Sequence, residues 1–386
     1  MNIVVLAGGL SPERDVSLSS GCLIANALIE NGHRVLLADV YMGVGGDVGG
    51  IGGAARTGGL GAVDGVGAAD GVIGAGDADG GARGFEQAYQ AHRRERYEYR
   101  IPEAEPDLAA LAAARGGGPA LIEESILPIC VGADVVFLAL HGSIGENGQL
   151  QAALDLHGVR YTGTGFTGSL LAMDKPLSKE LMRFHGIDTP DWGIYNIADG
   201  APPPGGLTFP CVIKPCACGS SIGVSIVKSA AEFTAALAYA GKYEDRVMIE
   251  QMIPGREFSI GILGSEALPP IEIIPKAGFY DYKNKYQPGL TEEVCPAELP
   301  AGLSRAMQET ALRVHAALRL GDYSRIDFIL DGAGRWFCLE ANTLPGMTPT
   351  SLLPQEARAV GIPYNALCER LVKLACERER LSPERG

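Results

Sequence analysis

The segment with the most chemical information places acidic and amide side chains on the two strands of a short hairpin. Asp327 lies in an apolar run, residues 328–330, that is typical of a buried strand. Residues 331–334 predict a turn, and the chain then returns with Glu340 and Asn342, which lie two residues apart and so share one strand face. Three oxygen-bearing side chains therefore converge across one hairpin. Such ligands suit Mg²⁺ that bridges nucleotide phosphates.

The alternative interpretation of this segment is a hairpin with a polar, solvated face. Strand patterning would explain the alternation of apolar and polar residues. It does not explain the Asn-Thr-x-Pro-Gly-Met-Thr sequence with which the second strand ends, at residues 342–348. We therefore favour the metal site.

A second candidate site follows an apolar strand, where Lys214 precedes a loop rich in glycine and serine. Glycine lets backbone N–H groups turn towards a polyanion, and the hydroxyls of Ser220 and Ser221 add donors. The lysine precedes the loop, so this is not a P-loop, and a plain turn remains an alternative. Lys175 offers another cation, although taken alone it fits an ordinary surface lysine better.

Two further carboxylates lie on either side of a Pro-Gly turn. Glu250 ends one apolar strand and Glu257 opens the next. Carboxylates at these positions can accept hydrogen bonds from an adenine amine or from ribose hydroxyls. Each of them alone would more often be a solvated strand end.

Length and composition indicate a globular protein of several domains. The chain has 386 residues, enough for two or three domains and a sizeable core. Its net charge of −14 argues against a general nucleic-acid surface, but a local group of lysines and arginines can still bind a small anion. No stretch approaches the roughly 20 apolar residues that span a membrane. Nine cysteines without zinc-like spacing fit the reduced thiols of a cytoplasmic protein.

The elements that must position these side chains predict an α/β fold. Residues 1–40 indicate a strand, a Gly-Gly loop, a helix over about residues 17–31 and a second strand over 34–39. Residues 42–84 are mostly Gly, Ala, Asp and Val, which predicts a mobile surface insertion because few large side chains can offset the ordering entropy. Residues 85–118 are polar and give no clear assignment. From residue 133 onwards, strands and helices alternate.

Taken in order, these segments resemble the ATP-grasp superfamily, and within it the family of D-alanine–D-alanine ligases. The resemblance covers the chain except for about residues 42–130. The matching pieces are Gly8-Gly9-x-Ser11-x-Glu13-Arg14, His141-Gly-Ser-Ile-Gly145-Glu146-Asn-Gly148, Tyr161-Thr-Gly163, Met173-Asp-Lys175, Lys214-Pro, Gly219-Ser220-Ser221, Lys285-Tyr286, Cys295-Pro-Ala297 and residues 325–354.

The resemblance implies a three-domain ATP-grasp fold. A Rossmann-like N-terminal α/β substrate domain would span residues 1–162 and include the insertion. A central subdomain would span 163–250, and a C-terminal subdomain 251–386 would carry a lid loop at 276–289 and the metal site. ATP would lie between the second and third domains, and the protein would be a cytoplasmic homodimer.

The resemblance also implies roles for individual residues. ATP would be bound by Lys175, Lys214, Ser220, Ser221, Glu250, Ile253, Glu257 and Lys285. Two Mg²⁺ ions, or Mn²⁺ in their place, would be held by Asp327, Glu340 and Asn342. Substrate amino acids would be met by Glu13, His141, Lys285, Ser351 and Leu352. Glu13 would form a catalytic triad with Ser220 and Tyr286, while Arg325 and the Gly346 backbone would stabilise the transferring phosphoryl group and the oxyanion.

The activity that follows is ATP-dependent ligation of two D-alanine molecules through an acyl phosphate, for peptidoglycan synthesis. D-Serine as second substrate stays open, since it needs only a polar contact near Leu352. D-Lactate is disfavoured by the Lys285-Tyr286 pair, which ester-forming relatives lack. A regulator with a decayed nucleotide site is disfavoured by the intact set of Arg325, Asp327, Glu340 and Asn342.

Overall fold

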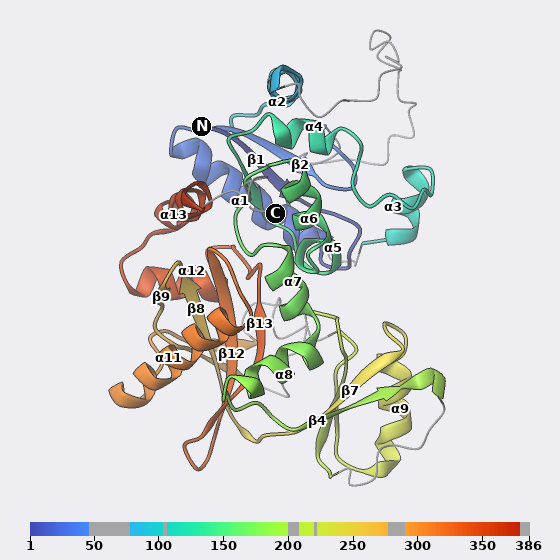
Figure 1. Ribbon diagram of the computed structural model, residues 1–386, viewed down its shortest axis with the longest axis vertical. Coiled ribbons are helices and arrows are strands. Elements are labelled where there is room, and N and C mark those ends of the chain that lie inside the picture. The colour runs from blue at the N-terminus through green and yellow to red at the C-terminus, as the bar shows by residue number, and fades with distance from the viewer. Residues whose placement is uncertain (46–77, 103–105, 200–207, 220–221, 277–289, 379–386) are drawn as a thin grey trace.

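The residues that the structure describes form three β-sheets (Figure 1). The computed structural model describes residues 1–45, 78–102, 106–199, 208–219, 222–276 and 290–378. None of the helices in these ranges is both long and apolar enough to cross a membrane.

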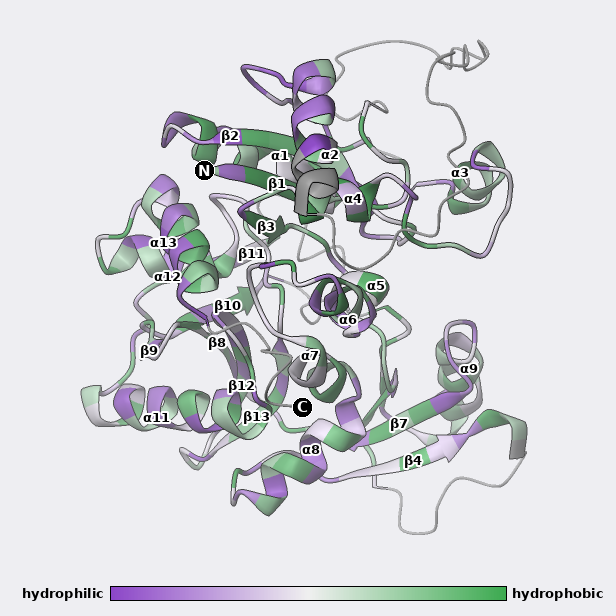
Figure 2. Ribbon diagram, turned by 45° about the horizontal axis from the view of Figure 1, so that its top comes forward, coloured by the Kyte–Doolittle hydropathy of each residue, from purple (hydrophilic) through white to green (hydrophobic). Residues whose placement is uncertain are grey.

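The N-terminal sheet has three parallel strands in the order β2-β1-β3. These strands are β1 (Asn2–Ala7), β2 (Arg34–Asp39) and β3 (Val135–Leu138), and α1 (Arg14–Glu30) connects the first two. Their nearly continuous apolar runs are expected for parallel strands that are covered on both faces, and Figure 2 shows β1 and β2 almost entirely in the hydrophobic colour. The predicted strand–helix–strand opening is confirmed, with the helix starting about three residues earlier than expected.

Several short helices complete the N-terminal part. Before β3 come α2 (Ala78–His92), α3 (Leu108–Ala114) and α4 (Ile126–Val131); after it come α5 (Ser143–Glu146) and α6 (Gln149–Leu156). The structure differs from the prediction at residues 78–84, which begin α2 rather than belonging to a surface insertion. Phe85 accounts for the difference, because it is fully buried in the N-terminal core and anchors the helix. Residues 46–77 lie outside the described part.

Close packing between α2 and α4 makes Gly84 sensitive to substitution. A Cβ atom on Gly84 would lie 2.8 Å from the carbonyl oxygen of Pro128. We expect Gly84→Ala to lower the free energy of unfolding by about 1–3 kcal/mol, as overpacking does. Gly302 is the control, because it is also helical but a Cβ there meets no atom within 4 Å. Gly302→Ala should raise stability by up to about 1 kcal/mol. Urea denaturation of both variants measures their free energies of unfolding. Equal stability of the two variants would contradict the close packing of α2 against α4.

The central sheet is antiparallel, with strand order β4-β7-β5-β6. Its strands are β4 (Trp192–Asn196), β5 (Cys211–Pro215), β6 (Ser225–Val227) and β7 (Arg246–Gln251). A 3₁₀ turn, η1 (Ile197–Asp199), follows β4, and α9 (Ala230–Ala240) packs its Phe233 and Ala236 against the sheet to close a small separate core.

The C-terminal sheet is also antiparallel and has the order β11-β10-β8-β12-β13. Its strands are β8 (Gly255–Leu263), β10 (Ile271–Pro275), β11 (Thr291–Val294), β12 (Tyr323–Asp331) and β13 (Trp336–Asn342), and a short β9 (Glu266–Ala267) pairs with β8. The helix α11 (Ala301–Ala317) contributes Met307 and Val314 to its core. The predicted hairpin is confirmed as β12–β13, with Asp327 opposite Glu340 and Arg325 opposite Asn342.

The hydrophobic cores cross the predicted domain limits. The helices α7 (Phe166–Met173) and α8 (Lys175–Phe184) contribute Ala172 and Met182 to the core of the C-terminal sheet. The last helices, α12 (Leu352–Ala359) and α13 (Tyr364–Glu377), belong to the N-terminal core instead. The limits at residues 162 and 250 therefore stay predictions, while the packing joins the N-terminal and C-terminal sheets to helices from other predicted domains.

Candidate active site

Two adjoining cavities lie beside the C-terminal sheet. The first, about 490 Å³, is lined by α1, the loop before α5, the end of β13 and the start of α12. The second, about 460 Å³, lies between strands of the central sheet and strands of the C-terminal sheet. Lys175, Gly219 and Glu340 line both cavities. A molecule in one cavity can therefore meet a molecule in the other at these residues.

Most of the predicted site residues line one of these cavities. The first cavity brings together Glu13, His141, Lys175, Arg325, Glu340, Asn342, Gly346, Ser351 and Leu352. The second brings together Lys175, Lys214, Glu250, Ile253, Glu257, Asp327 and Glu340. Outside the described residues lie Ser220, Ser221, Lys285, Tyr286 and all of the predicted lid except Lys276.

The loop before α1 places Glu13 at the wall of the first cavity. The Gly8 N–H donates to Ser17 Oγ at 2.8 Å, and the Gly9 N–H donates to Asp39 Oδ1 at 3.2 Å. Gly8 has a φ of +73°, and a Cβ there would lie 2.5 Å from the Asp39 carboxylate, so only glycine fits. Arg14 forms an ion pair with Asp39. Arg14 thus fixes the loop, while the buried Glu13 occupies the N-cap of α1 and faces the cavity.

A second carboxyl group, Glu146, lies on the same cavity wall and was not assigned a role from the sequence. The Gly142 N–H donates to Glu146 Oε2 at 2.7 Å. Burial, reinforced by the charge of Glu13, raises the pKa of Glu146 to about 8. Burial also lowers the pKa of His141. The only sequence signal was the position of Glu146 in the motif that begins at His141.

The raised pKa of Glu146 predicts a pH-dependent stability. An unfolded glutamate loses its proton near pH 4.5, whereas folded Glu146 keeps it up to about pH 8. The folded state thus binds the extra proton between these values, so the stabilisation from Glu146 is complete below pH 4.5 and is lost as the pH rises to about 8. Glu146→Gln removes this dependence.

We therefore expect the variant to gain thermal stability relative to the unaltered protein as the pH rises from 5 to 8. Melting temperatures measured across this range test the expectation. A constant difference between the two proteins would show that Glu146 is ionised when folded.

The β12–β13 hairpin brings the predicted metal ligands together. Asp327 accepts two hydrogen bonds from Arg325, at 2.9 and 2.8 Å, and one from Ser259 Oγ at 2.8 Å. Asn342 Nδ2 donates to the same carboxylate at 3.0 Å, and Glu340 lies 3.3 Å from Lys175 Nζ. This arrangement follows from the strand register, which sets Arg325 opposite Asn342 and Asp327 opposite Glu340.

The hairpin supplies two carboxylates and one amide as oxygen donors. Among the residues that the structure describes, no cluster of three or more His, Cys, Asp or Glu side chains could by itself hold a metal ion. Mg²⁺ usually binds one or two carboxylates and completes its shell with water and phosphate oxygens. The donor set therefore fits Mg²⁺ that arrives with a phosphate ligand.

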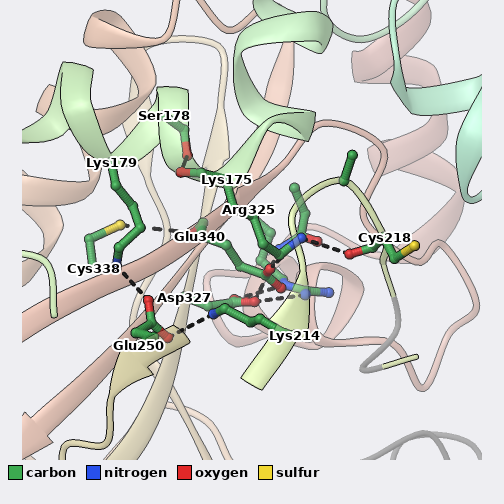
Figure 3. A network of polar contacts seen from close by, with 12 residues as sticks. Lys175, Ser178, Lys179, Lys214, Cys218, Glu250, Arg325, Asp327, Cys338 and Glu340 are labelled. Carbon is green, nitrogen blue, oxygen red and sulfur yellow. Dashed lines mark hydrogen bonds and ion pairs between the residues drawn. The ribbon is translucent and has the colours of Figure 1, made fainter. Parts of the chain in front are cut away.

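A buried ion-pair network supports the second cavity (Figure 3). The two oxygens of Glu250 bind different lysines, with Lys214 Nζ at 2.7 Å and Lys179 Nζ at 2.5 Å. Lys175 Nζ donates to the Cys218 carbonyl at 2.7 Å and so tethers the loop after β5. Lys179 was not among the residues predicted from the sequence. It lies four residues after Lys175 on the same face of α8, and this spacing was an available signal.

The turn after β13 presents backbone groups to the first cavity. Ser351 Oγ accepts the Thr348 N–H at 3.1 Å, and Tyr364 OH donates to the Met347 carbonyl at 2.6 Å. A Cβ on Gly346 would lie 2.9 Å from Ser351 Oγ, so a side chain there would displace the serine. The turn therefore holds the Gly346 backbone and the Ser351 hydroxyl close together at the cavity wall.

Comparisons with known proteins give matches over nearly the whole chain. Residues 2–164 match the family model described as "D-ala D-ala ligase N-terminus", and residues 203–373 match "D-ala D-ala ligase C-terminus". The chain is 39% identical to the D-alanine–D-alanine ligase of Pediococcus pentosaceus, over 96% of this chain and 97% of that protein. It is 36% identical to the enzyme of the same name from Lacticaseibacillus casei, over 96% and 95%.

A solved structure is similar over its whole length. The crystal structure of D-alanine–D-alanine ligase from Bacillus anthracis complexed with ATP has a TM-score of 0.68 and 26% identity, and the match covers 100% of both chains. The α/β ATP-grasp fold that the sequence predicted is thus the fold of this protein. With both family models and near full-length relatives in agreement, the chain belongs to the D-alanine–D-alanine ligase family.

Proposed function

We propose that this protein is an ATP-dependent ligase that joins two D-alanine molecules to D-alanyl-D-alanine for peptidoglycan synthesis. The observation that carries this proposal is the pair of adjoining cavities that share Lys175 and Glu340. One cavity holds Glu13 and Arg325, groups that suit an amino acid and a transferring phosphate. The other holds Lys214, Glu250 and Glu257, groups that suit a nucleotide.

The chemistry requires two sites in contact. A carboxylate is too poor an electrophile to condense with an amine in water. One carboxylate oxygen of the first D-alanine therefore attacks the γ-phosphorus of ATP, ADP leaves, and an acyl phosphate forms. The amine of the second D-alanine, having lost a proton, attacks the carbonyl carbon, and the C–O bond to phosphate breaks. Both steps depend chiefly on positioning and on stabilisation of developing charge.

Each substrate meets residues of fitting charge in the first cavity. We assign the ammonium of the first D-alanine to Glu13, with His141 beside it, and the transferring phosphoryl group to Arg325. The Gly346 N–H would stabilise the tetrahedral oxyanion, and Ser351 with Leu352 would meet the second D-alanine. By resemblance, Ser220 and Tyr286 would complete a triad with Glu13. Lys285 would bind the second carboxylate, and residues 276–289 would act as a lid.

The nucleotide belongs to the second cavity in this proposal. Lys175 and Lys214 would bind phosphate oxygens, and Glu250, Ile253 and Glu257 would contact the adenosine, with further contacts from Ser220, Ser221 and Lys285. Asp327, Glu340 and Asn342 would hold two Mg²⁺ ions or Mn²⁺. Bound metal of this kind neutralises phosphate charge during transfer. A cytoplasmic location would supply the ATP, and we expect the protein to act as a homodimer.

A substrate panel tests the proposal. We expect ADP, phosphate and D-alanyl-D-alanine to form in equal amounts from ATP and D-alanine. D-Serine and D-lactate are offered as second substrates together with D-alanine. A preference for either one would contradict the assignment of the second substrate. Failure of D-alanine to stimulate ADP release would contradict the ligase proposal itself.

A further inference from the structure

Lys179 is a fully buried cation that the proposed chemistry does not use. Its side chain is 0% exposed, and it is not among the described residues that line the second cavity. The ammonium group binds Glu250 Oε1 at 2.5 Å, donates to Thr189 Oγ1 and lies 5.2 Å from the centre of the Trp192 ring. A buried lysine needs such partners because burial alone disfavours its charged form, and burial lowers the pKa of Lys179 here.

Glu250 connects this buried lysine to the cavity. Its second oxygen accepts from Lys214 Nζ at 2.7 Å, and both Glu250 and Lys214 line the second cavity. Figure 3 shows Lys179 and Lys214 reaching the carboxylate from different elements, α8 and β5. Although burial opposes charge on both groups, their mutual attraction lowers the pKa of Glu250 and raises that of Lys214. Glu250 and Lys214 are thus held in their charged forms, and the 2.5 Å contact with Glu250 Oε1 pairs the Lys179 ammonium group with the same carboxylate.

The net charge of this network determines how strongly it attracts an anion in the cavity. One carboxylate between two ammonium groups leaves one surplus positive charge at the wall of the cavity. Without Lys179, Glu250 and Lys214 would form a neutral pair. Lys214 and Glu250 are largely buried, with 11% and 4% of their side chains exposed, so this surplus attracts a polyanion more strongly than the same charge on an exposed surface. The neighbouring pair, Lys175 with Glu340, is already balanced.

We propose that Lys179 is a positioning residue for nucleotide binding, which acts through Glu250. By holding one oxygen of Glu250, it orients the other towards Lys214 and keeps the surplus positive charge beside the phosphates of ATP. The proposal rests on the nucleotide site of the proposed function. Lys179 would thus influence the affinity for ATP without contacting ATP or D-alanine.

Binding of a non-hydrolysable ATP analogue with Mg²⁺, measured by calorimetry without D-alanine, tests the proposal. We expect Lys179→Met to raise the Kd of the analogue about tenfold or more, since hydrogen bonds to charged groups have effects of that size. In turnover assays, the KM for ATP should rise likewise while the KM for D-alanine stays within about twofold of the unaltered protein. Lys179→Arg, which keeps the charge, should recover most of the affinity.

Arg183 provides a matched control. It lies one turn further along α8 and stacks on the same Trp192 ring at 4.3 Å, but its ion pair is with Asp191. Arg183→Met therefore removes a cation from the same helix and the same tryptophan without touching Glu250. The Kd of the analogue should stay within about twofold of that of the unaltered protein. If Arg183→Met and Lys179→Met lost the same affinity for the analogue, the effect would come from packing around Trp192. That result would overturn the proposal.

A double-mutant cycle tests whether the effect passes through Glu250. In a Glu250→Gln background, Lys179→Met should change the Kd of the analogue clearly less than the tenfold change expected in the unaltered background, because the carboxylate that Lys179 holds is already gone. The same tenfold change in both backgrounds would show that Lys179 acts independently and would overturn the proposal. If Lys179→Met unfolds below the assay temperature, Lys179→Gln takes its place, with the same expectations.

The analogue experiment also separates this inference from the proposed function. Failure of the unaltered chain to bind the analogue would overturn the nucleotide site and this inference together. Binding by the unaltered chain with equal binding by Lys179→Met would overturn the inference alone.

Discussion

Replacing Glu340 by Gln is expected to reduce kcat about 100- to 1000-fold while leaving the fold intact. Glu340 lines both cavities, so it lies where phosphate would pass from nucleotide to amino acid. The variant keeps the shape of the side chain and loses its charge, which would weaken the binding of Mg²⁺ at the proposed metal site. Removal of one preorganised group of this kind has effects of about that size on other enzymes.

The measurement is the rate of phosphate release at several Mg²⁺ concentrations. Raising the Mg²⁺ concentration should restore part of the activity if metal binding is what the variant lost. Glu309→Gln, on the exposed face of α11, is the control and should behave like the unaltered protein. An unchanged rate for Glu340→Gln at saturating Mg²⁺ would refute the metal assignment.

The second large effect is expected for Arg325→Met, with a fall in kcat of about 1000-fold. Arg325 binds Asp327 through Nε and Nη2 and lines the first cavity, where the phosphoryl group would be transferred. An arginine that stabilises charge only in the transition state affects kcat rather than substrate affinity. The KM for ATP should therefore change less than about threefold. The fold should survive, because Asp327 retains Ser259 and Asn342 as partners.

The same hairpin supplies the control for this variant. Arg335 pairs with Asp331 at the turn between β12 and β13, but its side chain is 69% exposed, against 15% for Arg325. Arg335→Met removes the same group from the same hairpin far from the cavities, and it should leave kcat unchanged. Steady-state kinetics of both variants decide the matter. A fall in ATP affinity that accounts for the whole defect of Arg325→Met would show that Arg325 binds the ground state.

The sequence predicted those parts of the site that rest on local rules. Strand alternation and turn residues predicted the β12–β13 hairpin, and the two-residue spacing of Glu340 and Asn342 placed both side chains on one face. The loop and helix that carry Glu13 were likewise predicted from an apolar run followed by Gly-Gly.

Long-range packing explains what the sequence analysis missed. Lysine is usually a surface residue, and the burial of Lys179 depends on an ion pair with Glu250, which lies 71 positions later in the sequence. Glu146 holds its proton because other parts of the chain enclose it beside Glu13. Residues 78–84 are rich in glycine and alanine, yet Phe85 anchors them in α2. None of these outcomes follows from local composition.

Isotope transfer tests the central claim most directly. If the first D-alanine attacks ATP through its carboxylate, one of its oxygens leaves with the phosphate when the peptide bond forms. With D-alanine labelled with ¹⁸O in the carboxylate, mass spectrometry of the released phosphate should therefore find one ¹⁸O atom in each molecule. Unlabelled phosphate, formed together with D-alanyl-D-alanine, would show that no acyl phosphate forms and would contradict the mechanism built on the two adjoining cavities.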